Sequence, residues 1–578
     1  MSNNTTISIG SDGYYHPSTE EQIIQLVKKA SNENLGIRCR GSAHSLSHAI
    51  YTNPGKGDPP VRNTVSEQYP PKGPNINIML DNFMKLTWID EQNGIIEVEA
   101  GIHLGFDPED PTGKSTLANS LLCQVTQKGW TLNDLGGITH QTVSGFMMTG
   151  SAGGTLMYSL DDNILAIRMI DGNGNVDWID KNDNRDLFNA LAISLGLMGI
   201  VTKVRFKLNK NFYIYGQQIT RPTDATFPVD LFGSGTPNKP SMKEFLQKTP
   251  YTRMLWWPQK GVERMVIWES VRGTPLPVFD PVEYSDFSTN TFLSQLEQLA
   301  GALLFTLLGN KNIFMVFAKL VKDFRQFFHN VKSRPQPNEC TPPKHSGGFW
   351  SWLKSIIRWI FAAILTAVLI LISVVLVLFF GILRPVLLLL YPVVVDILQP
   401  LTKGGTAQVF MDYMWRSLPM DNSADDILMG TEFTEIWIPL EYTEQAMNLL
   451  KQLFEKEGTK ASGYYSTELY AGYKSNYWMS PSYERDVLRV DVFWYINNAG
   501  NPAAKNGMYD YFWKLFRDND VPFRLHWGKF LPEYDYKDWA EYLRKQYPKW
   551  DDFMKLRALR DPKNIFLTDY WKKHLFGE

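Results

Sequence analysis

The sequence predicts an α+β fold, and three observations support this prediction. Short segments rich in β-branched and aromatic residues, such as 95–99 and 201–208, show the alternation that is typical of strands. Residues 433–454 indicate a strand followed by an amphipathic helix. Strand-like and helix-like segments alternate without a repeat of any fixed period, which argues against a repeat protein. The length of 578 residues suggests about three or four structural units.

In the first 210 residues, turn motifs separate the predicted strands. Asn93-Gly94 and Asp171–Gly174 each lie between two strand-like segments, as in a β-hairpin. Ser18 and Glu21 form a capping-box pattern ahead of a first helix. The segment 37–49 indicates a strand that runs into a turn of small residues. The other predicted elements are helices at 117–128 and 186–195 and strands at 76–80, 86–89, 95–99, 164–170, 176–179 and 201–208.

The middle of the chain contains a long uncharged segment. Residues 359–383 exceed the ~20 apolar residues that a bilayer-spanning helix needs, so we expect a membrane segment rather than a buried core helix. Tryptophan and basic residues flank it, as at a membrane interface. Arg384-Pro385 is expected to break the run before a second apolar stretch, 386–395, which is too short to span alone. The first twenty residues lack the regions of a signal peptide, so no cleavable signal is expected.

Composition excludes several classes of function. The 58 Lys and Arg residues balance 60 Asp and Glu, so the chain lacks the basic surface that nucleic-acid binding requires. Three cysteines are too few for a disulfide scaffold, and none forms a Cys-x-x-Cys pair. The His, Cys, Asp and Glu residues show no metal-ligand spacing, so no metal is expected.

Three short segments remain as candidate site segments. Arg40–Ser45 follows a strand, and its small residues expose consecutive backbone N–H groups of the kind that bind a pyrophosphate. The glycine-rich stretch 136–151 lets the backbone approach a flat ring closely, and His526–Lys529 supplies a cation. Each taken alone is also compatible with an ordinary turn. Gly113–Thr116 lacks the rest of a P-loop, and Gly172–Gly174 lacks the third glycine of a dinucleotide fingerprint.

The order of these motifs resembles the vanillyl-alcohol-oxidase family of flavoproteins, which share the PCMH-type FAD-binding domain. Within it the chain is similar to the aldonolactone oxidoreductase branch, which includes alditol oxidase and gulonolactone and arabinonolactone oxidases. The similarity is strong before residue 210 and returns in TEFTEIWIP (431–439), WMSPSYERD (478–486), HWGK (526–529) and LRDPKNIF (559–566). It implies an FAD-binding domain of two subdomains at 14–210, a cap or substrate domain at 211–290 and 405–578, and a helical insert at 291–404.

The resemblance implies that the cofactor is FAD. In this branch a loop histidine is commonly bonded to the flavin, and His44 is the matching residue; a bystander or ordinary loop histidine remains the alternative. Relatives often have Gly-Thr-His-Gly where this chain has Gly150–Gly153, so one polar contact is lost. The implied FAD-binding residues are Arg40, Gly41, Ser42, Ala43, His44, Ser45, Gly136, Gly137, Thr142, Gly145, Thr149, Gly150, Ser151, Ala152 and Ile200.

The resemblance also implies the catalytic positions Lys529, Glu468, His526 and Tyr470. A fixed cation at Lys529 stabilises charge at the flavin, and a carboxylate at Glu468 binds a substrate hydroxyl. A surface lysine and a solvated strand glutamate are the alternatives. The arginine usual in this branch is replaced by Tyr470, with Lys474 as a possible substitute. A His and a Thr are replaced by Asp491 and Phe493, so we expect a less polar alcohol or modified lactone rather than a simple alditol.

These expectations combine into a membrane-associated FAD-dependent oxidoreductase that oxidises a CH–OH group by hydride transfer to flavin N5. Gly136, at a position where oxidases of this branch have glycine, favours O2 as the acceptor, with H2O2 as product. Because His526–Lys529 must reach the flavin, both flanks of the insert lie on one side of the membrane, in a hairpin, re-entrant or in-plane arrangement. Basic flanks favour a body on the cytoplasmic side. The alternatives are a dehydrogenase or reductase that uses a quinone or a lipid-like substrate, and a catalytically inactive membrane scaffold.

Overall fold

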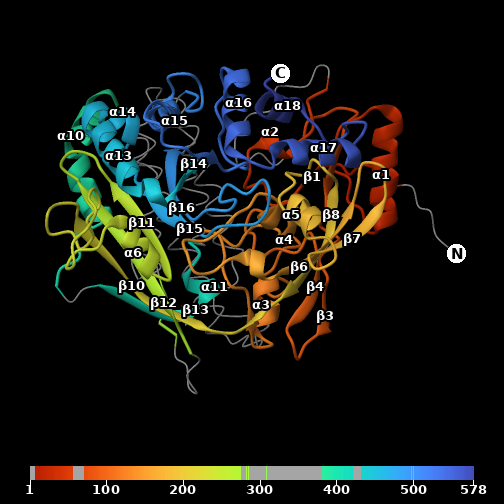
Figure 1. Cartoon of the computed structure of the whole chain (residues 1–578), viewed down its shortest axis with the longest axis horizontal. Helices are drawn as coiled ribbons and strands as arrows, with labels where there is room; N and C mark the ends of the chain where they lie inside the picture. Colours follow the sequence, from red (N-terminus) through yellow and green to blue (C-terminus); the bar gives the residue numbers. More distant parts are fainter. Residues whose placement is uncertain are drawn as a thin grey trace, which may run out of the picture.

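The computed structural model describes residues 7–55, 70–274, 281–282, 284, 308, 380–404, 407–420, 431–495, 498 and 500–578. Figure 1 shows two halves side by side, with residues up to about 210 on the right, the segment that follows on the left, and the C-terminal helices back at the top, toward the right half. One continuous hydrophobic core runs through both halves, from Ile23 in the first to Trp513 in the second.

The first half contains a five-stranded antiparallel sheet in the order β3-β4-β8-β6-β7 and a parallel pair β1-β2 among the described residues. Both predicted hairpins are confirmed, because β3 pairs with β4 and β6 pairs with β7. The first helix is capped by Thr19, one residue beyond the predicted Ser18. The elements are α1 Glu20–Glu33, β1 Ile37–Arg40, α2 Ser47–Ile50, β2 Ile76–Met79, β3 Leu86–Asp90, β4 Ile95–Glu99, α3 Leu121–Thr126, β5 Trp130–Thr131, α4 Val143–Met148, β6 Ile164–Ile170, β7 Val176–Asp180, α5 Arg185–Leu191, β8 Ile200–Lys207 and β9 Asn209–Lys210.

The second half is built on an eight-stranded antiparallel sheet, β13-β10-β12-β11-β15-β16-β14-β17, within the described residues. The three strands from before the insert, β10, β12 and β11, lie between β13 and β15 from after it, so both segments contribute to one sheet. The elements are β10 Tyr213–Pro222, α6 Met242–Lys248, β11 Tyr251–Trp257, β12 Arg264–Gly273, α10 Phe380–Leu398, β13 Gln408–Tyr413, α11 Met414–Ser417, β14 Thr431–Pro439, α13 Thr443–Glu457, α14 Thr459–Ser462, β15 Thr467–Gly472, β16 Val487–Tyr495, α15 Met508–Asp518, β17 Arg524–Leu525, α16 Tyr536–Gln546, α17 Trp550–Arg560 and α18 Asp569–Phe576.

The C-terminal segment returns to the first half of the molecule. The backbone N–H of Ile37 in β1 donates to the Ile565 carbonyl at 2.8 Å, and the Arg38 guanidinium donates to the Phe566 carbonyl at 3.2 Å. The indole of Trp571 in α18 donates to the Ala49 carbonyl at 3.2 Å. These contacts hold the end of the chain beside the loop that follows β1.

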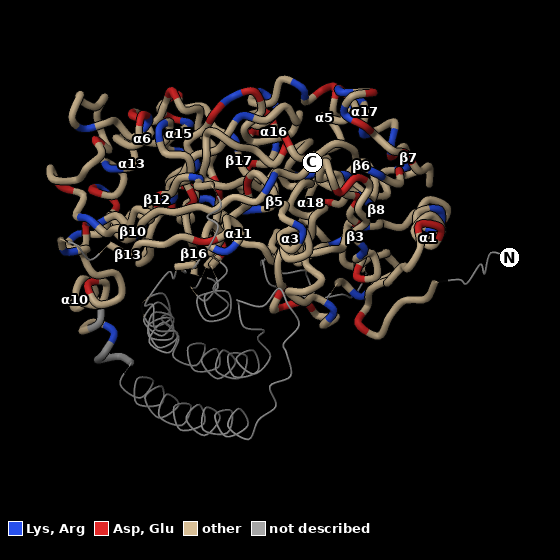
Figure 2. The backbone as a smooth tube through the Cα atoms, turned by 90° about the horizontal axis from the view of Figure 1, so that it is seen from below, with Lys and Arg blue, Asp and Glu red and all other residues tan. Residues whose placement is uncertain are grey.

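Helix α10 lies at the periphery of the second half (Figure 2). It continues through Arg384-Pro385, so the break predicted there is wrong. A proline inside a helix removes one backbone hydrogen bond and crowds the preceding turn, yet α10 contains both Pro385 and Pro392. Within the described residues, no helix combines the length and the apolar character needed to cross a membrane. Residues 359–379, most of the predicted membrane segment, lie outside the described residues.

Candidate active site

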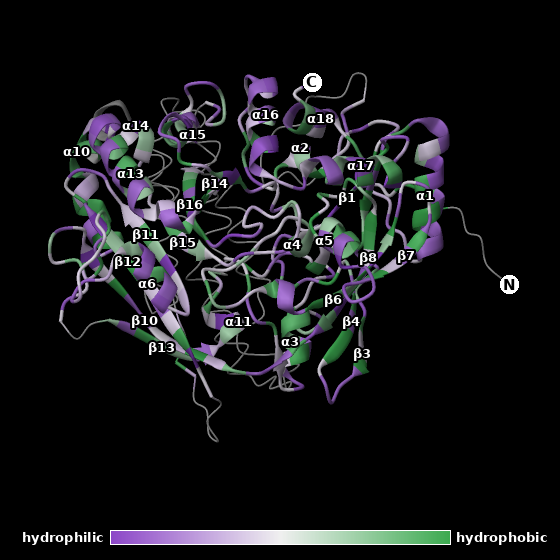
Figure 3. Cartoon of the chain, in the orientation of Figure 1, coloured by the Kyte–Doolittle hydropathy of each residue, from purple (hydrophilic) through white to green (hydrophobic). Residues whose placement is uncertain are grey.

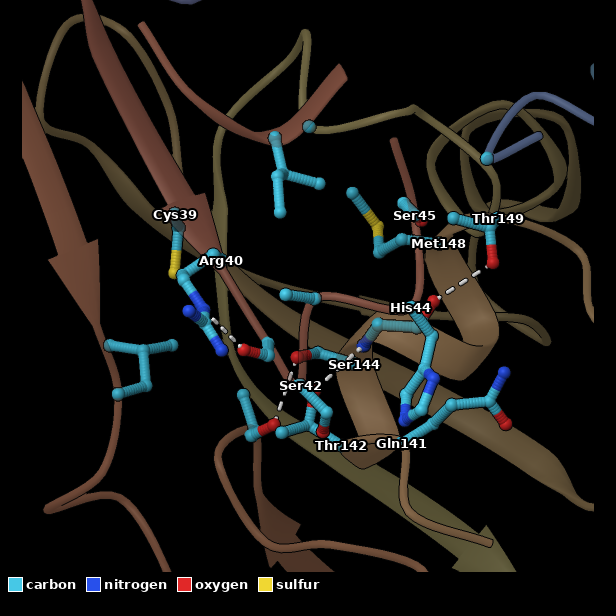
Figure 4. Close-up of a pocket in the computed structure, with 18 of the residues that line it drawn as sticks. Cys39, Arg40, Ser42, His44, Ser45, Gln141, Thr142, Ser144, Met148 and Thr149 are labelled. Carbon is cyan, nitrogen blue, oxygen red and sulfur yellow. Dashed lines mark hydrogen bonds between the residues drawn. The ribbon is translucent and has the colours of Figure 1, made fainter. Parts of the chain in front are cut away.

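A cavity is lined by the loop after β1, by helix α4 and by the segment 526–529. Figure 4 shows the loop with His44 and the helix with Ser144 and Met148. The loop after β1 turns sharply because Ala43 adopts a left-handed conformation with φ of 57°. Gly41 is required there, since a Cβ atom would lie 2.3 Å from the Thr142 hydroxyl oxygen. That hydroxyl accepts from the Gly145 N–H at 3.3 Å and so caps the start of α4.

The loop presents unused hydrogen-bonding groups to the cavity. None of the backbone N–H groups from Ser42 to Ser45 donates to another described residue. The His44 Nε2 atom is enclosed and has no hydrogen-bond partner in the described part of the chain. Burial, together with the neighbouring His140 at a ring distance of 5.5 Å, lowers the pKa of His44 to about 3. The imidazole is therefore neutral at physiological pH.

Lys529 and His526 join this loop to the sheet of the second half. The Lys529 ammonium donates to the His44 carbonyl at 3.0 Å, and the Leu46 N–H donates to the Gly528 carbonyl at 3.1 Å. The same ammonium lies 4.1 Å from the centre of the Phe433 ring in β14. Burial lowers the pKa of Lys529, and it lowers that of His526 to about 4.

One face of the eight-stranded sheet carries charged side chains near Lys529 and His526. In β16 the even positions 488, 490 and 492 are buried in the apolar core, whereas Arg489 and Asp491 lie on the opposite face. Arg489 forms a buried ion pair with Glu435 of β14, donates to the Tyr470 hydroxyl, and donates to the Ala152 carbonyl at 2.6 Å. Arg489 thus ties the sheet to the turn that follows α4.

The structure brings most of the predicted site residues together around the cavity. Gly136 is not among the residues that line the cavity. A Cβ atom at this position would lie 3.0 Å from the Phe146 ring, so the glycine permits close packing of that ring. The predicted residues that line the cavity are Arg40, Gly41, Ser42, Ala43, His44, Ser45, Thr142, Gly145, Thr149, Ser151, Ile200, His526 and Lys529. Those not among its lining residues are Gly136, Gly137, Gly150, Ala152, Glu468 and Tyr470.

Sequence reasoning missed two residues of the site. Arg489 is the cation beside Tyr470, directly opposite it in the β15–β16 register, whereas Lys474 is exposed and does not fill that place. Arg489 could have been predicted from its position two residues before Asp491, because alternate residues of a strand share a face. Asp107 also lines the cavity, 3.4 Å from the His103 ring, but no local motif marks it.

Comparison with known proteins agrees with this geometry. A family model described as D-arabinono-1,4-lactone oxidase matches residues 423–574. The chain is 24% identical over 271 residues, 47% of its length, to a putative D-arabinono-1,4-lactone oxidase of Neurospora crassa, and the match covers 39% of that protein. It is 20% identical over 246 residues to L-gulonolactone oxidase of Bos taurus, covering 42% of this chain and 45% of the relative. The chain thus spans less than half of the length of these relatives.

The fold is also similar to that of a solved structure. Cholesterol oxidase from Brevibacterium sterolicum, in a His121Ala mutant, superposes with a TM-score of 0.59 at 12% identity, over 97% of this chain and 94% of the other. The chain is thus similar in sequence to D-arabinono-1,4-lactone and L-gulonolactone oxidases, and similar in fold to cholesterol oxidase. The unbonded amides of Ser42–Ser45 fit the pyrophosphate of FAD, and the enclosed, unpartnered nitrogen of His44 fits a site that a ligand completes.

Proposed function

We propose that this protein is an FAD-dependent oxidoreductase that oxidises a CH–OH group of a sugar lactone or a related alcohol. The observation that carries the proposal is the junction of Lys529 with the His44 loop at the wall of one cavity. This junction brings together a loop of free backbone amides, a neutral histidine and a buried cation from residues 485 positions apart. The D-arabinono-1,4-lactone oxidase match over residues 423–574 supports the lactone class.

Different residues of the site would bind the phosphates of FAD, carry the covalent link and stabilise charge. Bound FAD would supply the hydride acceptor for the CH–OH donor. Arg40–Ser45 and Thr149–Ser151 would hold the phosphates through backbone amides, and His44 would carry the covalent link. Lys529 places a positive charge at the boundary between cavity and sheet, where it would stabilise negative charge on a bound ring.

The proposal is tested with the purified full chain by visible spectroscopy before and after acid precipitation. We expect a flavin spectrum that stays with the pellet, and release of the flavin to the supernatant in His44→Ala. D-Arabinono-1,4-lactone and L-gulono-1,4-lactone should bleach the spectrum under nitrogen. A chain that binds no FAD, or whose FAD is bleached by no lactone or alcohol of a broad panel, contradicts the proposal and favours a scaffold.

The acceptor proposed is O2, with H2O2 as the product. Peroxide is measured with a coupled peroxidase assay during lactone turnover. Stoichiometric peroxide supports the oxidase. Turnover that requires an added quinone and yields no peroxide supports a dehydrogenase instead, and it leaves the FAD and lactone assignments intact.

Membrane association is proposed from helix α10 and the sequence that precedes it. One face of α10 is fixed to the body through a hydrogen bond from Tyr391 to the Tyr464 carbonyl, 3.1 Å, and an ion pair of Asp396 with Arg264. The face of α10 opposite the buried Tyr391 and Val395 exposes apolar side chains, including Leu389 at 80% and Ile397 at 69%, and Figure 3 shows the apolar colouring of this helix. Exposed apolar clusters of this kind mark interaction surfaces.

The flanks of the insert support a membrane segment that returns to its starting side. Val282 and Met411 exchange two backbone hydrogen bonds of 2.8 and 2.9 Å, so the chain enters and leaves the insert at one edge of the sheet. The uncharged run 359–383 lies between these flanks. A hairpin or in-plane arrangement meets this constraint, with the body on the cytoplasmic side.

Vesicle flotation of the full chain tests the role of α10. Leu389→Asp and Ile397→Asp together should weaken binding to lipid vesicles, whereas Leu559→Asp in α17 should not, although Leu559 is also 74% exposed. Equal binding of all variants would assign the membrane contact to other residues. Protease accessibility of the body in sealed membrane vesicles tests the cytoplasmic side.

A further inference from the structure

Side chains from three separate segments come together beside the cavity of the candidate active site. His44, His103 and Asp107 are among the residues that line this cavity. The His140 ring lies 5.5 Å from the His44 ring, centre to centre, and His103, Asp107 and His140 are all buried. We refer to these four residues as the histidine cluster. In the described ranges no group of His, Cys, Asp and Glu side chains has the arrangement of a metal site, so proton transfer is the chemistry that the cluster offers.

Backbone hydrogen bonds fix the relative positions of the three segments. The Leu104 N–H donates to the Gln141 carbonyl at 2.9 Å, which joins the segment of His103 and Asp107 to that of His140. The Ser42 hydroxyl donates to the His140 carbonyl at 2.7 Å, which joins the loop after β1 to the same segment. The histidine cluster is therefore assembled by the main chain, and its four side chains come from positions that no single sequence motif connects.

Asp107 supplies a negative charge to the histidine cluster. Its Oδ1 atom accepts from the Glu109 N–H at 2.9 Å, and its Oδ2 atom lies 3.4 Å from Nε2 of His103. Burial alone would raise the pKa of Asp107, but the hydrogen bond with His103 and the neighbouring imidazole rings, that of His140 included, bring it below its ordinary value. Asp107 is therefore a carboxylate that stabilises positive charge on the rings beside it.

His44 has the protonation state of a nucleophile. Burial and the neighbouring His140 lower the pKa of His44 to about 3, so its ring is neutral and carries one N–H and one free lone pair. The other charged groups that face it are Asp107, Lys529 and Arg40. A ring nitrogen that bonds to carbon leaves the imidazole positively charged unless the N–H proton departs. Because two of these three groups are cations, a neutral product is favoured, and a base is needed to take the proton.

We propose that His140 is the base that accepts the N–H proton of His44 when His44 forms its covalent bond to FAD, and that Asp107 stabilises the charge that His140 then carries. The inference rests on the proposed function, since it requires FAD and the link at His44. The His140 ring lies beside the His44 ring, whereas His103 is engaged with Asp107 and positions it. A nucleophile, a base and a carboxylate that supports the base form the arrangement by which proteins activate a weak nucleophile.

The covalent step is an oxidation of a methyl group on the flavin ring. One C–H bond of the methyl group breaks, its proton leaves and its two electrons reduce the flavin, while the carbon forms a bond to a ring nitrogen of His44. The N–H proton of His44 passes to His140. O2, the acceptor proposed above, then takes the two electrons and the two protons as H2O2, which restores the oxidised flavin.

The test follows covalent bond formation in the full chain, produced under riboflavin limitation and then mixed with FAD in air. Covalent flavin is measured by the fluorescence of the acid-washed, denatured chain, and non-covalent binding by the quenching of FAD fluorescence. We expect His140→Ala to bind FAD but to form the bond roughly a hundredfold or more slowly. Asp107→Asn keeps the shape of its side chain and should slow the bond at least about tenfold. It provides a second readout if His140→Ala fails to bind FAD.

Chemical rescue separates a base from a ring that only fills space. Added imidazole should restore the rate of bond formation in His140→Ala, whereas pyrazole, which has the same shape but is a much weaker base, should not. His48→Gln is the matched control. His48 is also a histidine of the segment after β1, but its ring stacks on Tyr570 of α18 at 6.0 Å, so the variant should form the covalent bond at the wild-type rate.

The outcomes distinguish this inference from the proposed function. Bond formation in His140→Ala or Asp107→Asn at the wild-type rate, or equal rescue by pyrazole, overturns the inference even where a lactone bleaches the flavin. If the variants behave as expected but no lactone or alcohol bleaches the flavin, the role of His140 stands and the proposed reaction falls. If the wild-type chain binds FAD only non-covalently, the inference and the link at His44 are overturned together, while bleaching by a lactone still supports the oxidoreductase.

Discussion

The loop after β1 and the charged face of β14–β16 meet at Lys529, yet they are built in different ways. The loop contributes backbone amides, so its chemistry depends on small residues that are adjacent in the sequence, Gly41 to Ala43. The sheet contributes side chains from three strands, and its chemistry depends on register, which places Glu435, Asp491 and Glu468 in one row. A substitution in the loop is expected to act through a steric clash. A substitution in the sheet is expected to act by leaving a buried charge without its partner.

The largest effect is expected from Arg489→Met in the sheet. Arg489 is the cation paired with buried Glu435, and its removal leaves an uncompensated charge, which costs about 3–5 kcal/mol. Urea denaturation of the full chain measures the loss in the free energy of unfolding. The double variant Arg489→Met with Glu435→Gln should recover part of it, because the unpaired charge is gone.

An exposed ion pair provides the control for Arg489. Arg544 and Asp551 form a pair at 3.0 Å with side chains that are mostly exposed, so Arg544→Met should change stability by less than about 1 kcal/mol. Similar losses from both variants would show that the buried pair carries no special charge balance.

A smaller effect is expected from Gly41→Ala in the loop. The new Cβ would lie 2.3 Å from the Thr142 hydroxyl oxygen, which caps α4, and overpacking of this kind costs about 1–3 kcal/mol. We expect reduced thermal stability and a lower flavin content per purified chain, measured by visible absorbance. Gly404→Ala is the control, since nothing lies within 4 Å of its added Cβ. Retention of FAD in Gly41→Ala would mean that the loop is not closely fitted to the cofactor.

The same contrast explains which parts of the fold and site could be predicted from the sequence. Hairpins at Asn93-Gly94 and Asp171–Gly174 and the strand at 201–208 depend on local turn chemistry and alternation, and all are confirmed. The loop at Arg40–Ser45 was found because its small residues are contiguous. Arg489 was missed because its importance comes from strand pairing with Tyr470 and Glu435, which no local pattern specifies.

Two further differences between prediction and structure also arise from contacts between segments that are distant in the sequence. The predicted helix break at Arg384-Pro385 did not occur, because packing of Tyr391 and Val395 against the body stabilises α10 despite its prolines. The expected loss of pocket polarity at Tyr470 and Asp491 also overlooked a compensation. Tyr470 and Asp491 are hydrogen-bonded to each other, and Arg489 supplies the cation from the neighbouring strand. Considering each substitution separately could not reveal this compensation between neighbouring strands.

The smallest effect is expected at His526, where the loop and the sheet are joined. Its Nδ1 accepts from the Gly528 N–H at 3.1 Å, and its ring stacks on Trp437 of β14. Burial lowers the pKa of His526 to about 4, below that of an unfolded histidine. As pH falls below about 6.5, the unfolded chain gains a proton that the folded chain does not, so folding stability decreases.

His526→Asn removes this term while keeping an acceptor for the Gly528 N–H. Between pH 7.5 and 5.5, the wild-type chain should lose about 1.4 kcal/mol more stability than the variant, the equivalent of one pKa unit. Urea denaturation of both proteins at the two pH values measures this difference. Parallel losses would mean that His526 becomes protonated in the folded chain within this range, and that the junction of loop and sheet accommodates a third positive charge beside Lys529 and Arg489.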